Sequence, residues 1–318
     1  MHNKIIVWIV LIFVLALAGC KSSQNTNPIT DIEIRKGTEG LTMEFLEFMP
    51  EKVFEEDIFE VGLNLKNKGA YDITDGRLFF GFETQYVDAD SAKKEKIFSI
   101  KGKSILNPEG NSEYLTINAR AKNIGSSETH TSTILATACY PYSTKADVSV
   151  CIDASPNAAR RQKPCEMKVL EFSEGQGAPV AVTKIETKIL PQENEKMIRP
   201  QFVIYMENKG EGRIIKANKI SNACSSEALA PRDFGAVLVK ASLSGNELEC
   251  SKTDKLEQNE YAEILLKENA EEGENRMVCK SKEGISKNED AFTAPLTIYT
   301  NYGYTFTTSK EIIIEKAD

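Results

Sequence analysis

Two segments, one in each half of this chain, share a strand-like pattern and end in the same triplet. Residues 59–66 read Phe-Glu-Val-Gly-Leu-Asn-Leu-Lys, with an apolar residue at every second position, and Asn67-Lys68-Gly69 follows. Residues 201–207 are mostly apolar and end in Asn208-Lys209-Gly210. A period of two is typical of a strand with one buried face, and Asn and Gly suit turns because they tolerate positive φ.

Further strand-like segments occur at residues 41–48, 78–82, 114–117 and 133–139, and helix signals are scarce. Several short strands separated by polar turns are typical of an all-β sandwich. Two more matches follow Asn67/Asn208 in the same order: Glu113-Tyr114 recurs as Glu260-Tyr261, and Tyr140-Pro-Tyr142 recurs as Tyr302-Gly-Tyr304. The sequence therefore predicts an all-β protein with two tandem, duplicated β-sandwich domains.

The predicted domains are residues 41–153 and 165–318, joined by a linker at 154–164. That linker has two prolines, three basic residues and no large apolar side chain. A protease-sensitive site at Arg160-Arg161 is the alternative interpretation of the same stretch.

The N-terminus predicts export. Lys4 precedes an uninterrupted apolar run from Ile5 to Ala18, shorter than the ~20 residues of a membrane-spanning helix but typical of a signal peptide, here residues 1–19. Leu17-Ala-Gly-Cys20 resembles the lipobox of lipoproteins, so we expect Cys20 to be lipidated and residues 20–40 to form a tether. An uncleaved N-terminal anchor is the alternative. Either way the chain would face the extracytoplasmic side of the cell membrane.

The formal net charge of −8 and the pI near 5.2 disfavour nucleic acid as a partner, because phosphate binding depends on clustered Lys and Arg. Apart from Cys20, six cysteines remain: Cys139, Cys151, Cys165, Cys224, Cys250 and Cys279. An even number in an exported chain predicts disulfides. No two lie two to four residues apart, as zinc sites usually require, so we expect no metal and no cofactor.

The cysteine spacing leaves the pairing open. If the chain folds back near residues 144–146, Cys139 would face Cys151 across a hairpin, Cys250 would pair with Cys279, and Cys165 with Cys224. The alternative pairs Cys151 with Cys165 and gives Cys139 a more distant partner.

Strands that end in Asn-x-Gly, as at Asn67 and Asn208, resemble those of Ig-like domains of the cell-adhesion-related (CARDB) kind. Such domains occur in tandem in envelope proteins of bacteria and archaea. Ala138-Cys-Tyr-Pro-Tyr142 and Gly175-Gln-Gly-Ala-Pro179 are also similar to segments of exported archaeal proteins. The resemblance implies sandwich domains at the cell surface and implies no catalytic residue.

Patterns typical of catalytic sites are scarce in the sequence. His130, the only histidine after the signal peptide, lies in a polar stretch and is expected to be a solvated loop residue. No Gly-x-Ser-x-Gly elbow is present, and Asp88-Ala-Asp90 with Glu95 lacks the glycine of a calcium loop. Carboxylate pairs are uninformative among 47 acidic residues.

Tyr140, Tyr142, Tyr302 and Tyr304 are candidate binding aromatics, because tyrosine combines a flat apolar ring with a polar tip. Strand tyrosines at the edge of a core are the ordinary alternative. The expected function is a membrane-anchored extracytoplasmic binding or scaffolding protein, not an enzyme, with an envelope protein or a glycan as partner. The alternatives are a carboxylate-dependent surface hydrolase without a recognisable motif and an accessory subunit without a ligand site.

Overall fold

The computed structural model describes residues 31–90, 94–154, 163–192, 196–225, 228–251, 261–271 and 273–317. Residues from Asp31 onward form one compact unit. The signal peptide, Cys20 and residues 21–30 lie outside the described residues. Among the residues that are described, no helix is long and apolar enough to cross a membrane.

As far as it is described, the first half of the unit contains one helical turn and eight strands. Alternating burial in the strand at residues 58–67 agrees with the predicted strand at 59–66, where Val61, Leu63 and Leu65 are fully buried. The elements are α2 (Asp31–Ile34), β1 (Leu41–Phe45), β2 (Lys52–Phe54), β3 (Ile58–Asn67), β4 (Ile73–Phe82), β5 (Val87–Asp88), β6 (Glu95–Ile100), β7 (Ser112–Ala121) and β8 (Thr129–Ile152).

The described part of the second half adds ten strands and three short helical turns. These are β9 (Leu170–Glu171), β10 (Val180–Pro191), β11 (Met197–Asn208), β12 (Arg213–Ile215), η2 (Ala217–Lys219), α3 (Ile220–Ala223), η3 (Pro231–Asp233), β13 (Ala236–Leu243), β14 (Asn246–Cys250), β15 (Ala262–Leu265), β16 (Arg276–Ser281), β17 (Ile285–Ser286) and β18 (Phe292–Glu315). The prediction of an all-β protein is confirmed.

The strands form two sheets. A four-stranded sheet has the order β1-β3-β7-β5, and a 14-stranded sheet follows the path β6-β4-β8-β18-β13-β14-β16-β11-β10-β9, with β2, β12, β15 and β17 beside it. All pairings between these strands are antiparallel except that of β2 with β18. One hydrophobic core includes buried residues from both halves, among them Leu63 and Phe202.

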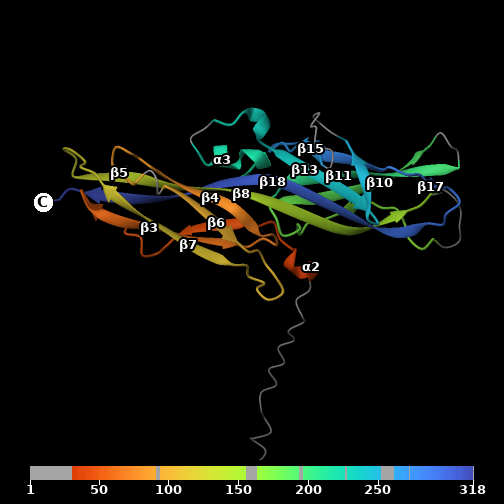
Figure 1. The fold of residues 1–318 in the computed structure, drawn as a ribbon, viewed down its shortest axis with the longest axis horizontal. Helices are drawn as coiled ribbons and strands as arrows, with labels where there is room; N and C mark the ends of the chain where they lie inside the picture. The colour runs from red at the N-terminus through yellow and green to blue at the C-terminus, as the bar shows by residue number, and fades with distance from the viewer. Residues whose placement is uncertain are drawn as a thin grey trace, which may run out of the picture. The chain divides into compact units, whose positions relative to one another are not determined.

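The longest pairing among the described strands joins β8 to β18 over 24 residues, from Thr129 opposite Glu315 to Ile152 opposite Phe292. Figure 1 shows the yellow-green β8 and the blue β18 running side by side. The predicted fold-back near residues 144–146 is therefore wrong. Thr144, Ala146 and Val150 are nearly fully buried, so the alternating pattern of β8 continues past the supposed turn.

Strand pairing shows which parts of the two halves correspond. In the first repeat, Ile134 of β8 pairs with Phe82, the last residue of β4. In the second, Leu296 of β18 pairs in the same way with Leu243, the last residue of β13. Leu41 pairs with Asn67, as Val180 pairs with Asn208. The counterparts of β1, β3, β4, β6, β7 and β8 are β10, β11, β13, β15, β16 and β18. We call residues 41–152 the first repeat and 180–315 the second repeat.

One of the three sequence matches is misaligned. Leu115 pairs with Leu63 in the first repeat, and Met277 pairs with the corresponding Ile204 in the second. Since β7 thus corresponds to β16, Tyr114 does not correspond to Tyr261, which precedes β15. The other two matches, at Asn67/Asn208 and at the paired tyrosines, agree with the strand pairing.

The two repeats are related by a local twofold axis at the middle of the β8–β18 pair. Pro141 lies directly opposite Gly303, its own counterpart in the second repeat, and Tyr140 and Tyr142 lie opposite Tyr304 and Tyr302. The repeats therefore share one continuous sheet, although the predicted domains were separated by a linker. Most of that linker, residues 155–162, lies outside the described residues.

Part of the predicted tether is folded. Within residues 20–40, the Gly37 N–H donates to Glu174 O at 2.7 Å, and Gly40 O accepts from the Lys68 N–H at 2.9 Å. The chain is therefore held against Glu174 and against the first repeat before β1 begins.

Candidate functional site

The four tyrosines predicted as candidate binding aromatics form a buried network on the twofold axis. Tyr140 and Tyr302 are fully buried, and Tyr142 and Tyr304 are each 3% exposed. Neighbouring rings pack with centroids 5.5–6.4 Å apart. They are almost fully buried because β8 and β18 turn their even-numbered residues inward.

In each repeat the Asn-Lys-Gly turn binds one tyrosine of the network, Tyr142 in the first repeat and Tyr304 in the second. The Tyr142 hydroxyl donates to Asn67 Oδ1 at 3.0 Å, and the Tyr304 hydroxyl donates to Asn208 Oδ1 at 3.1 Å. Each asparagine amide also donates, at 2.7 Å, to the carbonyl four residues later. A Cβ on Gly69 would lie 1.9 Å from the Tyr142 hydroxyl, which explains the glycine in this turn.

The other two tyrosines, Tyr140 and Tyr302, accept hydrogen bonds from the first strand of each repeat. The Leu41 N–H donates to the Tyr140 hydroxyl at 3.2 Å, and the Val180 N–H donates to the Tyr302 hydroxyl at 3.3 Å. Burial raises the pKa of all four tyrosines, that of Tyr304 to about 12. The hydroxyls therefore stay neutral at physiological pH and act as structural hydrogen-bonding groups.

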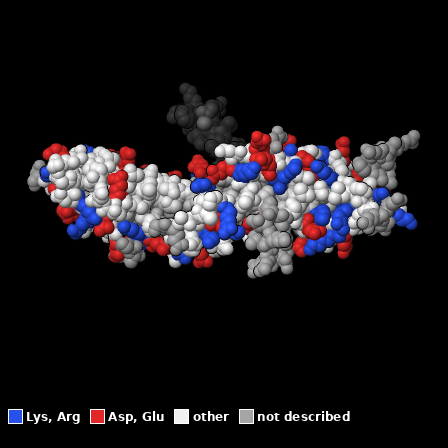
Figure 2. Space-filling model, turned by 90° about the horizontal axis from the view of Figure 1, so that it is seen from above, with Lys and Arg blue, Asp and Glu red and all other residues white. Residues whose placement is uncertain are grey.

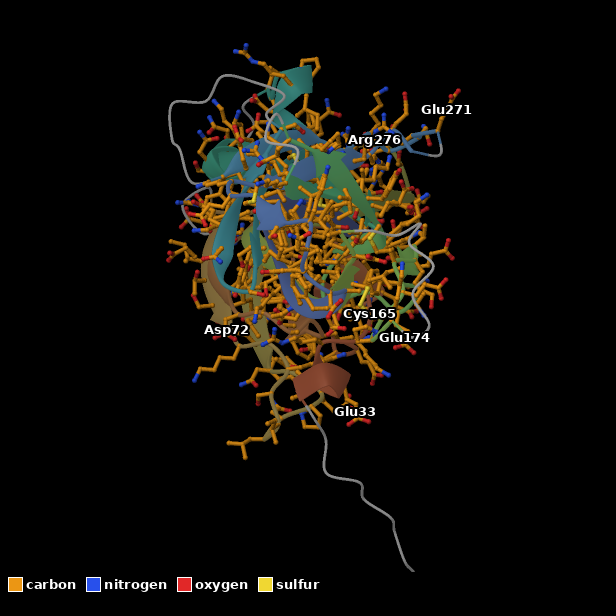
Figure 3. The ribbon with its side chains drawn as sticks, turned by 90° about the vertical axis from the view of Figure 1, so that its right-hand side faces the viewer. Glu33, Asp72, Cys165, Glu174, Glu271 and Arg276 are labelled. Atoms are coloured by element: carbon orange, nitrogen blue, oxygen red, sulfur yellow. A yellow bond between two sulfur atoms is a disulfide. The ribbon has the colours of Figure 1, made fainter. Side chains whose placement is uncertain are left out.

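Three disulfides join Cys139 to Cys224, Cys151 to Cys165 and Cys250 to Cys279. Figure 3 shows the bond at Cys165. The Cys139–Cys151 and Cys165–Cys224 pairings do not form, because Cys139 and Cys151 lie on one continuous strand; the alternative pairing is the one observed. Three disulfides indicate a protein that folds in an oxidising, extracytoplasmic compartment.

The outer surface of the four-stranded sheet carries exposed aromatic side chains. A Cβ on Gly62 would lie 2.7 Å from Leu46 Cδ1 and 2.9 Å from Phe48 Cζ, so both side chains cover this glycine. Phe48 is 58% exposed and Tyr114 is 66% exposed. Thr116 lies opposite Gly62, and Tyr114 is one alternate position away on the same face. We call Leu46, Phe48, Gly62, Tyr114 and Thr116 the aromatic face.

The corresponding surface of the second repeat has a different chemistry. Val203 and Tyr205 occupy the positions of Gly62 and Asn64. The Tyr205 hydroxyl donates to Glu186 Oε1 at 2.9 Å, and Lys184 Nζ lies 4.2 Å from the Tyr205 ring centroid. The hydrogen bond from Tyr205, with support from Lys184 and Lys188, lowers the pKa of Glu186. On the second repeat, Tyr205, Glu186 and Lys184 therefore bind one another, whereas the aromatic side chains of the aromatic face are exposed to solvent.

The aromatic face was missed at the level of sequence because its members come from three separate segments. A signal exists in the strand 59–66, where Gly62 interrupts a polar face of Glu60, Asn64 and Lys66. A glycine on the solvent side of a strand often marks close approach by another group, and here that group is Phe48.

The displaced carboxyl pKa values share one direction. Among the described residues, each carboxyl group with a displaced pKa has it lowered: Glu83, Asp147, Glu186, Glu247 and Glu274. A glycosidase general acid needs a raised pKa. The part of the chain that is described also holds no cluster of three potential metal ligands.

His130 does not lie in a loop as expected. It belongs to β8, stacks on Tyr86 with ring centroids 3.5 Å apart, and contacts Glu83 through Nε2 at 3.2 Å. On the face that Figure 2 shows, Lys and Arg are interspersed with Asp and Glu and form no extended basic area among the residues described. Asp88 lies in β5, and Glu95 pairs with Arg77 rather than joining a calcium loop.

No protein-family model matches this chain, and no curated protein matches its sequence. Among solved structures, the C-terminal domain of the antigen I/II polypeptide BspA from Streptococcus agalactiae is 9% identical over 87% of this chain and 100% of that one, with a TM-score of 0.16. The C-terminal domain of the antigen I/II-family protein AspA of Streptococcus pyogenes is 6% identical, over 88% of this chain and 100% of that domain, with a TM-score of 0.17. The sporulation control protein Spo0M of Bacillus subtilis is 11% identical over 53% and 80%, with a TM-score of 0.15. Likeness at this level carries no conclusion about function.

Proposed function

We propose that this protein is an exported binding or scaffolding protein of the cell envelope, held to the membrane through lipidated Cys20, with two Ig-like repeats of the CARDB kind as its working part. The aromatic face carries the proposal. It is an open, apolar surface on one repeat whose counterpart on the other repeat is closed by ion pairs. Exposed aromatic patches are typical of interaction sites.

The rigid joint between the repeats supports a scaffolding role. The β8–β18 pairing and the buried tyrosines fix the first repeat against the second, so a partner bound at the aromatic face would be held at a defined position. A flexible linker would not fix such a position. The partner would be an envelope protein or a glycan, and both make contacts with flat aromatic rings.

The experiment uses the protein isolated from its native membranes after crosslinking in place. Mass spectrometry of the N-terminal peptide should show a diacylglyceryl group on Cys20. The wild-type protein should capture a reproducible envelope protein, or bind purified surface glycans on an array, and Phe48→Ala with Tyr114→Ala should reduce that binding by about tenfold or more, as expected for central aromatic contacts.

Tyr299→Ala is the matched control, because Tyr299 is also an exposed aromatic residue, at 41%, but lies on β18 outside the aromatic face. Equal loss of binding in this control and in the Phe48/Tyr114 variant would contradict a role for the aromatic face. An unmodified N-terminal peptide that retains residues 1–19 would contradict the lipid anchor.

A further inference from the structure

The outer edge of β10, in the second repeat, is covered by the segment that precedes this strand and by Thr144 of β8. Gln176 donates from Nε2 to Val182 O at 3.0 Å and accepts from the Val182 N–H at 2.8 Å. Thr144 Oγ1 donates to Val180 O at 2.7 Å. The Phe172 N–H donates to Thr183 O at 2.8 Å, and β9 pairs with Lys184 and Ile185. The two-residue strand β9, the Phe172 N–H and the Gln176 side chain thus cover this edge together with Thr144.

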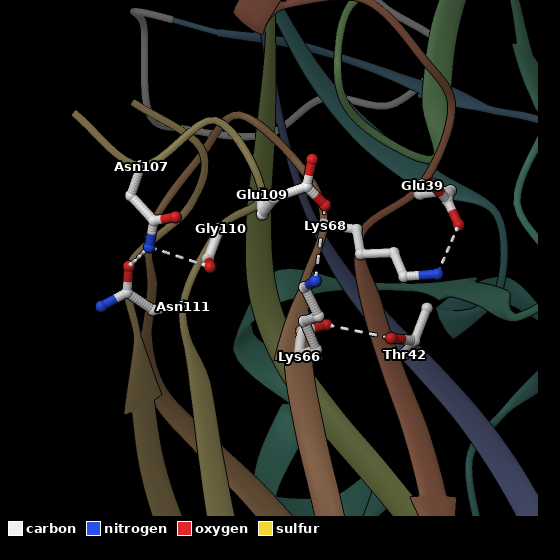
Figure 4. Close-up of polar contacts among 8 residues, drawn as sticks. All are labelled: Glu39, Thr42, Lys66, Lys68, Asn107, Glu109, Gly110 and Asn111. Atoms are coloured by element: carbon white, nitrogen blue, oxygen red, sulfur yellow. Dashed lines mark hydrogen bonds and ion pairs between the residues drawn. The ribbon is translucent and has the colours of Figure 1, made fainter. Parts of the chain in front are cut away.

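The first repeat leaves the equivalent edge of β1 open. On its inner side β1 is tied to β3: Thr42 Oγ1 donates to Lys66 O at 3.3 Å, and Lys68 pairs with Glu39 (Figure 4). On its outer side the Leu41 N–H reaches Tyr140. Among the described residues, no group hydrogen-bonds to Leu41 O or to the main-chain groups of Met43 and Phe45, whose counterparts in β10 are satisfied.

The cover is missing because the preceding chain turns the other way. Residues 35–37 correspond to 174–176, but they contact other parts of the chain: the Gly177 N–H, just before β10, donates to Gly37 O at 2.7 Å, and Arg35 lies 3.5 Å from Asp147 of β8. In addition, Phe306 of β18 is the counterpart of Thr144 of β8, and phenylalanine has no hydroxyl to offer Leu41 O. The two repeats differ at this edge although their joint is symmetric.

A groove of ≈ 350 Å³ runs along the open edge. Tyr140, Tyr304 and Phe306 contribute to its lining, as do Glu44 and Glu211. In the part of the chain that is described, neither of these two carboxylates forms an ion pair. The groove therefore combines unused main-chain donors and acceptors with an aromatic wall and negative charge.

We propose that the open edge of β1 is a strand-addition site for an extended peptide segment of a partner protein, with a basic residue near Glu44 and an apolar residue against Phe306. Added strands gain affinity from main-chain hydrogen bonds and specificity from alternate side chains. The protein already uses this interaction within itself over two residues, where β9 pairs with Lys184 and Ile185 of β10. The site is separate from the aromatic face and does not depend on it.

The probe is a synthetic peptide with the sequence of residues 168–177 carrying Glu171→Lys and Glu174→Lys. In the protein, Glu171 lies opposite Lys184, so lysine suits the acidic edge of β1. Bound to the mature full-length chain, the probe should slow hydrogen exchange at the Met43 and Phe45 amides. Exchange at Thr42 and Glu44 should not change, because these residues face β3.

Variants separate main-chain from side-chain effects. Phe45→Pro removes one edge donor and should weaken probe binding by about fivefold to tenfold relative to Phe45→Ala, the change expected from one hydrogen bond. Glu44→Lys should weaken binding, and Glu60→Lys, an exposed control on β3, should not. Binding of the probe by the Phe48/Tyr114 variant should be unchanged, which distinguishes this site from the proposed aromatic site.

Three results would overturn the proposal. The first is unchanged exchange at Met43 and Phe45 under the highest soluble probe concentration. The second is protection of these amides in the free chain that disappears when residues 21–30 are deleted, since the chain's own segment would then be the occupant. The third is protection that rises with protein concentration alone, which would identify a second copy.

Discussion

At the scale of residues, the four buried tyrosines make stability sensitive to alkaline pH. Their pKa values are raised by burial, that of Tyr304 to about 12, whereas an unfolded chain has tyrosines near pH 10. Below about pH 10 both states are protonated and the stabilisation is complete. Above it the unfolded state loses protons that the folded state keeps, so the free energy of unfolding falls.

We therefore expect the protein to unfold between about pH 10 and pH 12. In this range the free energy of unfolding should fall by roughly 1.4 kcal/mol per pH unit for each buried tyrosine, and by roughly 5 kcal/mol per pH unit for the four together. Tyrosinate absorbance and circular dichroism would follow ionisation and unfolding in one titration, and both should change in the same step. Tyr304→Phe should reduce the slope by about a quarter. Ionisation of all tyrosines near pH 10 in an intact fold would show that they are not buried.

At the scale of elements, the Cys139–Cys224 disulfide anchors the segment from β12 to η3 on the shared sheet. Its cysteines are 85 residues apart, against 14 for Cys151–Cys165. Chain entropy gives a larger stabilisation to the longer loop, about 4–5 kcal/mol against about 3. Replacing Cys139 and Cys224 with alanine should thus lower the unfolding free energy more than replacing Cys151 and Cys165.

Urea titration of both double variants measures this difference, and hydrogen exchange locates it. The Cys139/Cys224 variant should exchange faster over residues 213–235, and the Cys151/Cys165 variant should not. An identical loss of stability in the two variants would show that loop length does not control these bridges.

The sequence predicted a strand correctly where the strand's own residues alternate between apolar and polar. It did not predict features that depend on pairing with a strand distant in the sequence. The alternation at 59–66 predicted β3, because burial on one face is encoded locally. The long strand β8 was cut short at residues 144–146, because Pro141 and the polar residues after it resemble a turn. Its partner β18 lies at the far end of the chain, and nothing local to residues 140–152 specifies that pairing. The burial of the tyrosines and the open edge of β1 depend on the same long-range contacts.

At the scale of the whole molecule, the two repeats should not separate when the chain is cut between them. Cleavage at Arg160-Arg161 would leave the β8–β18 pairing in place, and both Cys139–Cys224 and Cys151–Cys165 would bridge the cut. The predicted linker would thus be cut without separating the two repeats.

Limited trypsin digestion followed by gel filtration measures this. The cleaved protein should elute as one species even after reduction of its disulfides, and it should separate into two fragments only in denaturant. Elution of two folded fragments under reducing, non-denaturing conditions would contradict a shared sheet.

The twofold axis at Pro141 and Gly303 has the form of an isologous interface, the kind that two identical subunits make in a homodimer. In a homodimer every substitution appears on both sides of the axis at once, so neither subunit can change alone. A single chain with two repeats is free of that restriction. Here one repeat has a covered strand edge and an ion-paired surface, whereas the other has an open edge and an aromatic surface. The symmetric centre holds the two repeats together while their outer parts differ.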